Sequence, residues 1–287
     1  MSGFAMRARV PASSANLGPG FDALALALDL HVEVEVTPSD RPRLVKEGEG
    51  ADLDIADEEH LAVEVVRRVT GHDSHAITVR SEIPVSRGLG SSASLALAAA
   101  AAAGADDPLA VAADVDGHPE NAGASFLGGF VTATTLGGRP IVERLPLDDD
   151  LVFVAVVPER TLATKDARAA LPDSVGFADA AFNVGRAGLL IAGMADARRL
   201  RREAFDDRLH QPHRTPLFPE SAALLAGLVD AGALGSCWSG AGPTMLGVCT
   251  REAAARVAEA AGRLLLEQQV AGAVRVLEAD RRGLVVG

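Results

Sequence analysis

The segment from Pro84 to Ala103 constrains the fold most, because it joins a glycine-rich turn to a strong helix-forming run. Gly88 and Gly90 allow the backbone to turn tightly and to approach a ligand without a Cβ in the way. Two serines follow where a helix would begin, and serine is a favoured N-cap. Residues 93–103 are almost entirely alanine and leucine, which predicts a helix that ends at Gly104.

This turn offers free N–H groups and the positive end of a helix dipole, a combination that suits a phosphate group. An ordinary strand–turn–helix corner would need the same glycines. This stretch alone therefore does not decide between a phosphate-binding turn and a purely structural corner. The P-loop pattern is absent, because no lysine follows the glycines. The dinucleotide fingerprint fits loosely at Gly88, Gly90 and Ala93, but Asp106 and Asp107 resemble a helix cap, not the acidic end of a strand. The doubled serine favours a third type, in which hydroxyls help to hold Mg²⁺ while backbone amides hold nucleotide phosphates.

Charge and cysteine content limit the partners and the compartment. The chain has 27 Lys and Arg against 39 Asp and Glu, a net charge of −12, which argues against a general surface for nucleic acid. Two cysteines are too few for a disulfide framework and predict a reducing compartment. The first residues lack the apolar segment of a signal peptide, and no apolar run reaches the roughly 20 residues that span a bilayer. We expect a cytoplasmic protein that binds neither nucleic acid nor membrane.

The length and the hydrophobic patterns predict two domains of mixed structure. A chain of 287 residues suits two domains or one large one, and the acidic turn Asp148–Asp150 predicts a boundary between residues 1–148 and 149–287. Strand–helix–strand repeats with antiparallel signals indicate an α+β sandwich in the second part. The first strand is expected to end at Pro11, and residues 37–50 are expected to form a loop. The expected strands cover residues 7–10, 31–36, 76–83, 130–134, 141–145, 151–157, 234–238, 245–249, 274–278 and 283–286; the expected helices cover residues 58–69, 93–103, 108–115, 177–195 and 252–267, with others that begin near Pro119, Thr164 and Pro219.

Two polar segments of the first half carry candidate chemistry. Asn16 and Asp22 are the strongest hydrogen-bonding side chains of a glycine-punctuated loop between apolar segments, and they either bind a ligand or only cap the backbone. Asp114, His118 and Asn121 gather around a helix start, where they suit either a metal and a substrate or a solvated face and a cap. No Cys/His spacing indicates zinc.

Three further segments of the second half are candidates. Thr164 is expected to cap a helix, which puts Arg168 one turn further on, at the right distance to bind a carboxylate with both guanidinium nitrogens. Arg214 ends a polar loop and would ordinarily be exposed. Residues 239–244 form a second glycine-rich turn, which either packs tightly against another segment or binds a ligand.

Three of these motifs, in this order, resemble those of the GHMP kinases: residues 11–22, 84–94 and 239–243. Within that family the first motif is most similar to the homoserine kinases, as are His118–Asn121, Thr164–Arg168 and His210–Arg214. The resemblance covers essentially the whole chain. It implies a two-domain α+β fold, with an N-terminal domain like ribosomal protein S5 domain 2, a C-terminal ferredoxin-like sandwich, and an active site between them.

The resemblance also implies roles for the central loop and for a metal. The loop would wrap the phosphates of ATP with Pro84, Val85, Ser86, Arg87, Gly88, Leu89, Gly90, Ser91, Ser92, Ala93 and Ser94. Ser92 and Asp114 would hold Mg²⁺. The family usually has a glutamate where Asp114 stands, and the shorter side chain puts a direct metal contact in question and allows a water-bridged one.

The substrate implied by the resemblance is L-homoserine. Arg168 and Arg214 suit its α-carboxylate, and Asp22 suits its α-ammonium group. Ser92, Asn121 and Arg168 are expected to take part in the reaction, with Asn121 beside the hydroxyl that accepts the phosphoryl group. The full set expected to hold the substrate is Asn16, Asp22, His118, Asn121, Thr164, Arg168, Arg214, Ser239, Gly240 and Gly242.

The expected reaction is direct in-line transfer from ATP, because no residue is an obvious strong base and the transition state is loose. Two other functions stay open. One is a GHMP kinase for another small alcohol, although the lysine of a mevalonate-type first motif is missing. The other is a non-catalytic, ligand-binding relative, supported only by Asp114. Homodimers are common in the family, which makes a homodimer an expectation here.

Overall fold

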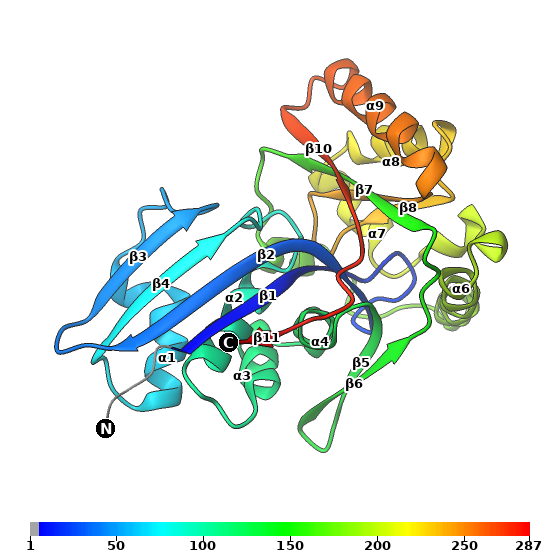
Figure 1. The fold of residues 1–287 in the computed structure, drawn as a ribbon. Helices are drawn as coiled ribbons and strands as arrows, with labels where there is room; N and C mark the ends of the chain where they lie inside the picture. Colours follow the sequence, from blue (N-terminus) through cyan, green and yellow to red (C-terminus); the bar gives the residue numbers. More distant parts are fainter. Residues whose placement is uncertain (1–5) are drawn as a thin grey trace.

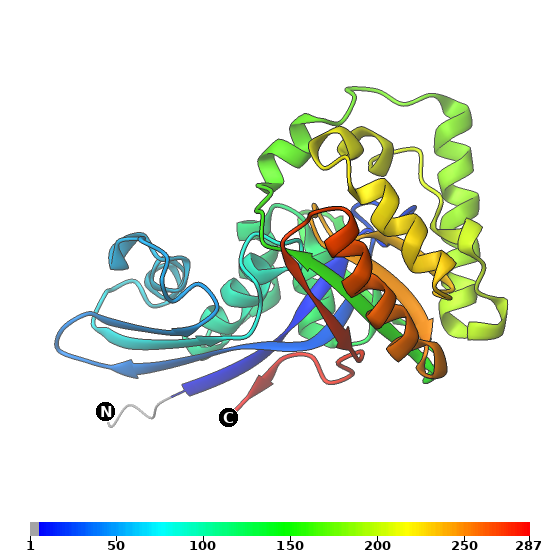
Figure 2. The ribbon, with the colours of Figure 1, turned by 90° about the horizontal axis from the view of Figure 1, so that it is seen from above.

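The computed structural model describes residues 6–287 as two neighbouring β-sheets, each covered by helices on one face (Figures 1 and 2). The first sheet has the order β11–β1–β2–β4–β3, and β5 pairs with both β2 and β6. Its elements are β1 (Met6–Ala15), β2 (Leu24–Pro38), β3 (Arg43–Gly48), β4 (His75–Ser81), β5 (Phe130–Leu136), β6 (Arg139–Leu145) and β11 (Val285–Val286), with helices α1 (Leu61–Thr70), α2 (Ser91–Ala102), α3 (Pro108–Asp116) and α4 (Pro119–Leu127).

The second sheet has four antiparallel strands in the order β10–β7–β9–β8. With α8 and α9 between its strands, the chain order is β–α–β–β–α–β, which is the ferredoxin-like arrangement that the family resemblance implies. The elements of this half are β7 (Leu151–Pro158), α5 (Thr164–Ala169), α6 (Phe177–Ala195), α7 (Gln211–Arg214), α8 (Ser221–Asp230), β8 (Gly235–Trp238), β9 (Met245–Thr250), α9 (Arg251–Glu267) and β10 (Gly272–Leu277).

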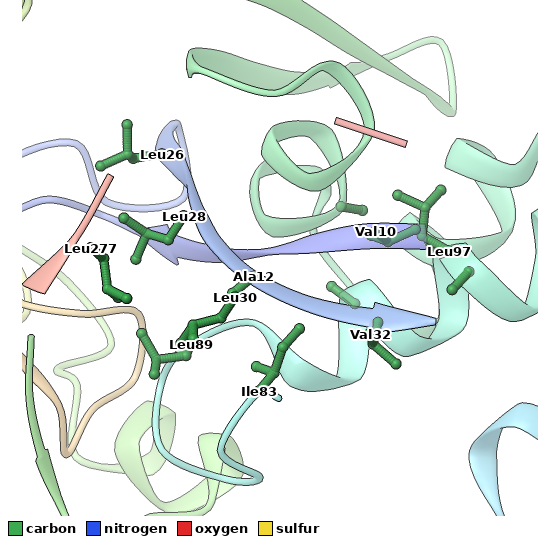
Figure 3. Packing of buried hydrophobic residues seen from close by; sticks show 14 of the residues in the cluster. Val10, Ala12, Leu26, Leu28, Leu30, Val32, Ile83, Leu89, Leu97 and Leu277 are labelled. Carbon is green, nitrogen blue, oxygen red and sulfur yellow. The ribbon is translucent and has the colours of Figure 1, made fainter. Parts of the chain in front are cut away.

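The last residues of the chain return to the first sheet. After β10, the strand β11 pairs antiparallel with β1, with Ala8 opposite Val286. Leu277 of β10 also belongs to the same buried cluster as Val10 and Leu28 of the first sheet (Figure 3). The two sheets therefore share part of one hydrophobic core. The expected domain boundary between residues 148 and 149 stays a prediction.

Helix α2 lies at the centre of the first half, where it contacts β1, β2 and the three other helices of that half. Its alanines are buried on all sides, and small side chains let the neighbouring elements approach closely. Leu97 projects from this helix into the core beside Val10 and Val32, while Ile83 and Leu89 extend the core toward the glycine-rich turn (Figure 3). The alanine-rich composition therefore reflects close packing around α2.

Several local predictions differ from the structure. Strand β1 does not end at Pro11: the pairing with β2 shifts by a bulge between Pro11 and Ala12, which accommodates the missing N–H, and the strand continues to Ala15. The segment expected to be a loop over residues 37–50 contains β3, a partly exposed strand that pairs parallel with β4.

The helix starts also differ in detail. His60, through Nδ1, accepts the capping hydrogen bond from Ala62 N in α1. The N-cap of α5 is Ala163, so Thr164 is the first helical residue and not the cap. The N-cap of α2 is Gly90, in the left-handed region, and the two serines form the first turn. Of the helices in residues 6–287, none is both long and apolar enough to cross a bilayer.

Gly90 gives a prediction about stability. Its φ is +66°, and a Cβ there would lie 2.1 Å from Ser13 Oγ, whereas Gly71 has a φ of +81° with no heavy atom within 4 Å. We expect Gly71→Ala to lower the free energy of unfolding by about 1 kcal/mol, from backbone strain alone. Gly90→Ala should cost about 2 kcal/mol or more, because overpacking adds to the strain. Urea unfolding of both variants checks this, and equal losses would contradict it.

Candidate active site

A cleft of about 330 Å³ lies where the loops of the two sheets meet. Its lining includes the glycine-rich turn, the start of α2, the loop between β1 and β2, and residues of α4, α5 and α7. Nine of the ten residues expected to hold a substrate line it; Ser239 does not. Of the central loop, the cleft is lined by Val85, Ser86, Gly88, Gly90, Ser91 and Ser92.

The glycine-rich turn presents the N-terminus of α2 to this cleft. Gly88 and Gly90 both have positive φ, and the first hydrogen bond of the helix runs from Ser94 N to Gly90 O at 2.9 Å. The N–H groups of Ser91 and Ser92 therefore precede the first helical bond and have no acceptor inside the helix. Together with the helix dipole, they form a site suited to phosphate oxygens.

Three other residues of the central loop hold it in place. Arg87 donates through Nε to Pro158 O at 2.9 Å and through Nη1 to Val85 O at 2.7 Å, which ties the turn to β7. Leu89 is fully buried, and Ser94 donates to Pro11 O at 2.8 Å. These side chains face the protein, so their part in the site is to fix the loop.

The second glycine-rich turn locks the other two motifs together. Ser239 Oγ lies 2.6 Å from Gly88 O and 2.8 Å from Ser14 Oγ, and it is fully buried. The carbonyl of Gly240 accepts from Asn16 Nδ2 at 2.9 Å and from Arg214 Nη1 at 2.8 Å. Ser239 was expected to touch the substrate, but the structure places it behind the cleft wall, where it braces the phosphate-binding turn.

A cluster of opposite charges lines the cleft. Arg168 donates to both carboxylate oxygens of Asp22, at 2.7 Å and 3.1 Å. Arg214 lies nearby, buried, and its Nε has no hydrogen-bond partner. Both guanidinium groups lie over the ring of Phe21, at 5.5 Å and 5.6 Å from its centre.

Arg214 is a buried cation that no carboxylate of residues 6–287 approaches within ion-pair distance. Burial, followed by repulsion from Arg168, lowers its pKa to about 10. A buried charge is costly unless it is paired. The cleft therefore offers the guanidinium group of Arg214, which an anionic group from outside the protein would pair, beside the ion pair of Arg168 and Asp22.

His210 orients Arg214. Burial lowers the pKa of His210 to about 4, so the ring is neutral at pH 7. Its Nδ1 is 3.1 Å from Arg214 Nη1, which can only donate, so Nδ1 accepts and Nε2 donates to Gly18 O at 2.7 Å. This pair fixes the guanidinium without adding a second buried charge.

The residues that position α7 were not among the expected site residues. Asp207 accepts from the backbone N–H groups of His210 and Gln211, at 2.9 Å and 2.6 Å, and from Asn183 Nδ2 of α6 at 2.7 Å. Burial opposes the ionisation of Asp207, but these donors outweigh it and lower its pKa. The sequence does hold a signal for this role. Asp207 shortly precedes the polar segment His210–Arg214, and aspartate often accepts hydrogen bonds from the backbone N–H groups where a helix begins.

The expected metal ligand Asp114 does not reach the cleft. Its side chain is 66% exposed and pairs with Arg68 Nη2 at 2.7 Å. Asp116 lines the cleft instead, with its side chain 16% exposed. Two residues on a helix point about 200° apart, so only one of these carboxylates can face inward. Burial raises the pKa of Asp116, against the opposing attraction of His118.

Asp116, His118 and Glu120 form a compact group at the junction of α3 and α4. His118 Nδ1 is 3.4 Å from Asp116 Oδ2 and 3.0 Å from Glu120 Oε1. Burial opposes the protonation of His118, but Glu120 and Asp116 outweigh it and raise its pKa. The group puts two carboxylates and an imidazole beside the phosphate-binding turn.

Asn121 is held by hydrogen bonds on both sides. Ser13 Oγ donates to Asn121 Oδ1 at 3.0 Å, and the Nδ2 group lies 3.5 Å from Asp116 Oδ2. The amide is therefore held in one orientation, and Asn121 lines the same cleft as the phosphate-binding turn and the cluster of Asp22, Arg168 and Arg214.

The residues present fit a hard cation such as Mg²⁺. The Ser92 hydroxyl and the Asp116 carboxylate both line the cleft next to the phosphate-binding turn, and oxygen is the ligand atom that Mg²⁺ prefers. Across residues 6–287, no group of three His, Cys, Asp or Glu side chains forms a complete metal cage. A few protein oxygens beside a phosphate site are typical of a Mg²⁺ that arrives with a nucleotide.

Comparisons with known proteins agree with this geometry. The model of the GHMP kinases N terminal domain matches residues 58–129, and the GHMP kinases C terminal model matches residues 184–265. A homoserine kinase of Streptomyces coelicolor is 39% identical over 288 residues, which cover 92% of this chain and 93% of the relative. A homoserine kinase of Moorella thermoacetica is 37% identical over 255 residues, covering 84% of this chain and 86% of the relative.

Solved structures also resemble this chain over almost its whole length. The crystal structure of homoserine kinase from Cytophaga hutchinsonii matches with a TM-score of 0.86 and 26% identity, and covers 99% of this chain and 97% of that one. A mevalonate kinase from L. major matches with a TM-score of 0.68 and 14% identity, over 99% of this chain and 96% of that one, and so shares the fold.

The neutral His210 gives a prediction about pH. Its pKa of about 4 in the folded protein is below the ordinary 6.5, so the unfolded chain binds the proton first as the pH falls. The part of the free energy of unfolding that depends on the neutral ring is fully present above pH 6.5 and is lost as the pH falls from 6.5 to 4. At pH 5 the loss is on the order of 2 kcal/mol. We expect His210→Gln to lose less free energy of unfolding than the wild type between pH 7 and pH 5.

Urea unfolding at the two pH values measures this difference. The control is His213→Gln, which removes an imidazole from the same short helix. If His210→Gln and the wild type lose the same free energy of unfolding between pH 7 and 5, the assignment of a neutral imidazole to the buried His210 is wrong.

Proposed function

The chain belongs to the GHMP kinase family, and from this premise we propose that it is a homoserine kinase. It transfers the γ-phosphoryl group of ATP to the side-chain hydroxyl of L-homoserine, giving O-phospho-L-homoserine and ADP, a step of threonine biosynthesis. The observation that carries the proposal is the cluster of Asp22, Arg168 and the buried Arg214 beside a phosphate-binding turn. Relatives named homoserine kinase, 33–39% identical over most of the chain, support the same substrate.

The cluster has the charges that an amino acid requires. The α-carboxylate would lie against Arg168 and Arg214, where it would neutralise the buried cation. The α-ammonium group would lie against Asp22, whose carboxylate is held by Arg168 in one orientation. Mevalonate has no ammonium group and galactose has neither charge, so each would leave part of this cluster unpaired, at a cost in affinity.

The phosphate-binding turn supports ATP as the phosphoryl donor. The amides of Ser91 and Ser92 would bind phosphate oxygens and stabilise the negative charge that develops during transfer. Asn121, fixed by Ser13 and Asp116, would hold the homoserine hydroxyl in line with the γ-phosphorus. Because the transition state is loose, this positioning would supply most of the rate without a phosphorylated enzyme intermediate.

We assign the Mg²⁺ site to Ser92 and Asp116, in place of Asp114. When bound, Mg²⁺ would neutralise charge on the transferred phosphoryl group. The chain's own contribution is to present the hydroxyl of Ser92, within the phosphate-binding turn, and the carboxylate of Asp116 in the same cleft. Ionisation of Asp116, which burial disfavours, would become favourable next to the cation.

We also infer a cytoplasmic location. The two cysteines, Cys237 and Cys249, are free and buried, as expected of a protein from a reducing compartment. The acidic net charge of −12 is consistent with a freely diffusing enzyme for small metabolites.

Release of ADP tests the proposed substrate. With ATP and Mg²⁺, we expect turnover with L-homoserine and little with mevalonate or galactose. Arg168→Met should raise the KM for homoserine by about 30-fold or more, because one carboxylate-binding group is lost and Asp22 is left unpaired, while the KM for ATP changes little. Arg160→Met is the control, because Arg160 does not line the cleft. Turnover of mevalonate or galactose instead of homoserine would overturn the proposal.

A pair of matched variants tests the Mg²⁺ site. We expect Asp116→Asn to lower kcat/KM by about 100-fold, because a charged group next to the transferred phosphoryl is lost. Asp114→Asn removes the same charge two residues away, on the outer face of α3, and should change kcat/KM less than twofold. Steady-state rates at several Mg²⁺ concentrations measure both, and a larger loss from Asp114→Asn would contradict the assignment.

A further inference from the structure

Two arginines of the cleft lie over one aromatic ring. The guanidinium carbons of Arg168 and Arg214 are 5.5 Å and 5.6 Å from the centre of the Phe21 ring. Both distances are within the roughly 6 Å over which the face of an aromatic ring attracts a cation. One neutral side chain thus contacts both of the residues proposed to bind the substrate carboxylate.

The ring of Phe21 packs against polar side chains and not within a hydrophobic core. The residue is partly exposed, and it belongs to none of the hydrophobic clusters found within residues 6–287. Its ring stacks on the neutral imidazole of His210, with the ring centres 5.2 Å apart and the planes 27° from parallel. His210 in turn is hydrogen-bonded to Arg214. Hydrophobic burial alone therefore does not account for a phenylalanine at this position.

The loop between β1 and β2 holds this ring in place. It extends from the first sheet to the start of α7 (Figure 1), where the carbonyl of Gly18 accepts a hydrogen bond from His210 Nε2 at 2.7 Å. Asp22 has a φ of +53°, and its backbone N–H donates to Asn16 Oδ1 at 3.0 Å. One fixed loop therefore presents the aromatic ring and the adjacent carboxylate of Asp22 together.

The two arginines repel each other, which sets what the ring must do. Burial, followed by repulsion from Arg168, lowers the pKa of Arg214, so the fold must offset the cost of this charge. Arg168 is paired with Asp22, but the printed partners of Arg214, which are Gly240 O and His210 Nδ1, are both neutral. The negative face of the Phe21 ring attracts both guanidinium groups and so favours their lying side by side.

An aromatic ring suits this position better than a second carboxylate would. A carboxylate would pair with the arginines more strongly, but it would occupy the N–H groups that the substrate carboxylate needs and would repel that carboxylate. A phenyl ring has no net charge and no lone pair, so it offsets part of the positive charge and leaves N–H donors available. The Nε of Arg214 is such a donor, since it is buried without a hydrogen-bond partner.

We propose that Phe21 is a positioning residue, whose ring holds the guanidinium groups of Arg168 and Arg214 together as one binding site for the α-carboxylate of the substrate. The inference rests on the proposed function, because it takes the substrate to be an amino acid. Phe21 does not line the cleft and acts only through the two arginines. Its loss should therefore weaken the binding of the amino acid far more than it slows the transfer step.

Steady-state kinetics of variants at position 21 test the proposal. Phe21→Leu should raise the KM for L-homoserine about tenfold or more, because two cation–π contacts are lost, while kcat and the KM for ATP stay within about twofold. Phe21→Tyr keeps the aromatic face and should bind homoserine nearly as well as the wild type. The control is Phe182→Leu: the guanidinium groups of Arg186 and Arg208 lie over Phe182, at 4.4 Å and 4.0 Å, but Phe182 does not line the cleft. An unchanged KM in Phe21→Leu, or an equal rise in Phe182→Leu, would overturn the proposal.

Fluorination separates the charge of the ring from its shape. Pentafluorophenylalanine at position 21 has nearly the same shape as phenylalanine, but the face of its ring is electron-poor. We expect the KM for L-homoserine to rise from phenylalanine through 3,5-difluorophenylalanine to pentafluorophenylalanine, with little change in kcat. A KM that stays constant along this series would show that the ring only fills space, and would overturn the proposal.

The free energy of unfolding in urea gives a readout that needs no substrate. Phe21→Leu should lower it less in the Arg214→Met or Arg168→Met background than in the wild type, because the ring then has one cation fewer to attract. Arg160→Met is the control background, because Arg160 lies over Phe218 instead, and there the loss should equal that of the wild type. Equal losses in all backgrounds would overturn the proposed contact. Absence of L-homoserine turnover by the wild type would instead overturn the proposed function.

Discussion

The site depends on the hydrogen bonds that the turn at Ser239 and Gly240 makes with the loops of the first sheet. Ser239 Oγ contacts Gly88 O at 2.6 Å, and Gly240 O accepts from both Asn16 and Arg214. One turn of the second sheet therefore fixes the phosphate-binding turn and the amino-acid cluster relative to each other. For a phosphoryl transfer, whose rate comes mostly from positioning, such a junction is what the fold must provide.

Much of this arrangement could be predicted from the sequence. The turn at Gly88 and Gly90 and the alanine-rich helix follow from local backbone preferences, and three motifs in order indicate the family and the two-domain α+β fold. The pairing of Arg168 with Asp22 follows less directly: each residue is a reasonable ligand for an amino acid, but 146 residues separate them and only the fold brings them together.

The remaining differences between the sequence-based expectations and the structure have physical causes. Asp114 and Asp116 have the same side chain on one short helix, and which of them faces inward depends on the rotation of α3 against α2. Strand β1 continues through Pro11 because a bulge accommodates the missing N–H, which no local pattern shows. Strand β3 lies at a sheet edge with exposed charged residues, so its sequence has no clear alternation. Ser239 is polar yet fully buried, because its partners come from two distant loops.

A crystal structure with L-homoserine and a non-hydrolysable ATP analogue would show directly where both substrates bind. We expect the γ-phosphate at the N-terminus of α2, the homoserine carboxylate against Arg168 and Arg214, and the hydroxyl beside Asn121 pointing at the γ-phosphorus. A triphosphate bound away from the Gly88–Ser92 turn, or homoserine bound away from the two arginines, would contradict this expectation.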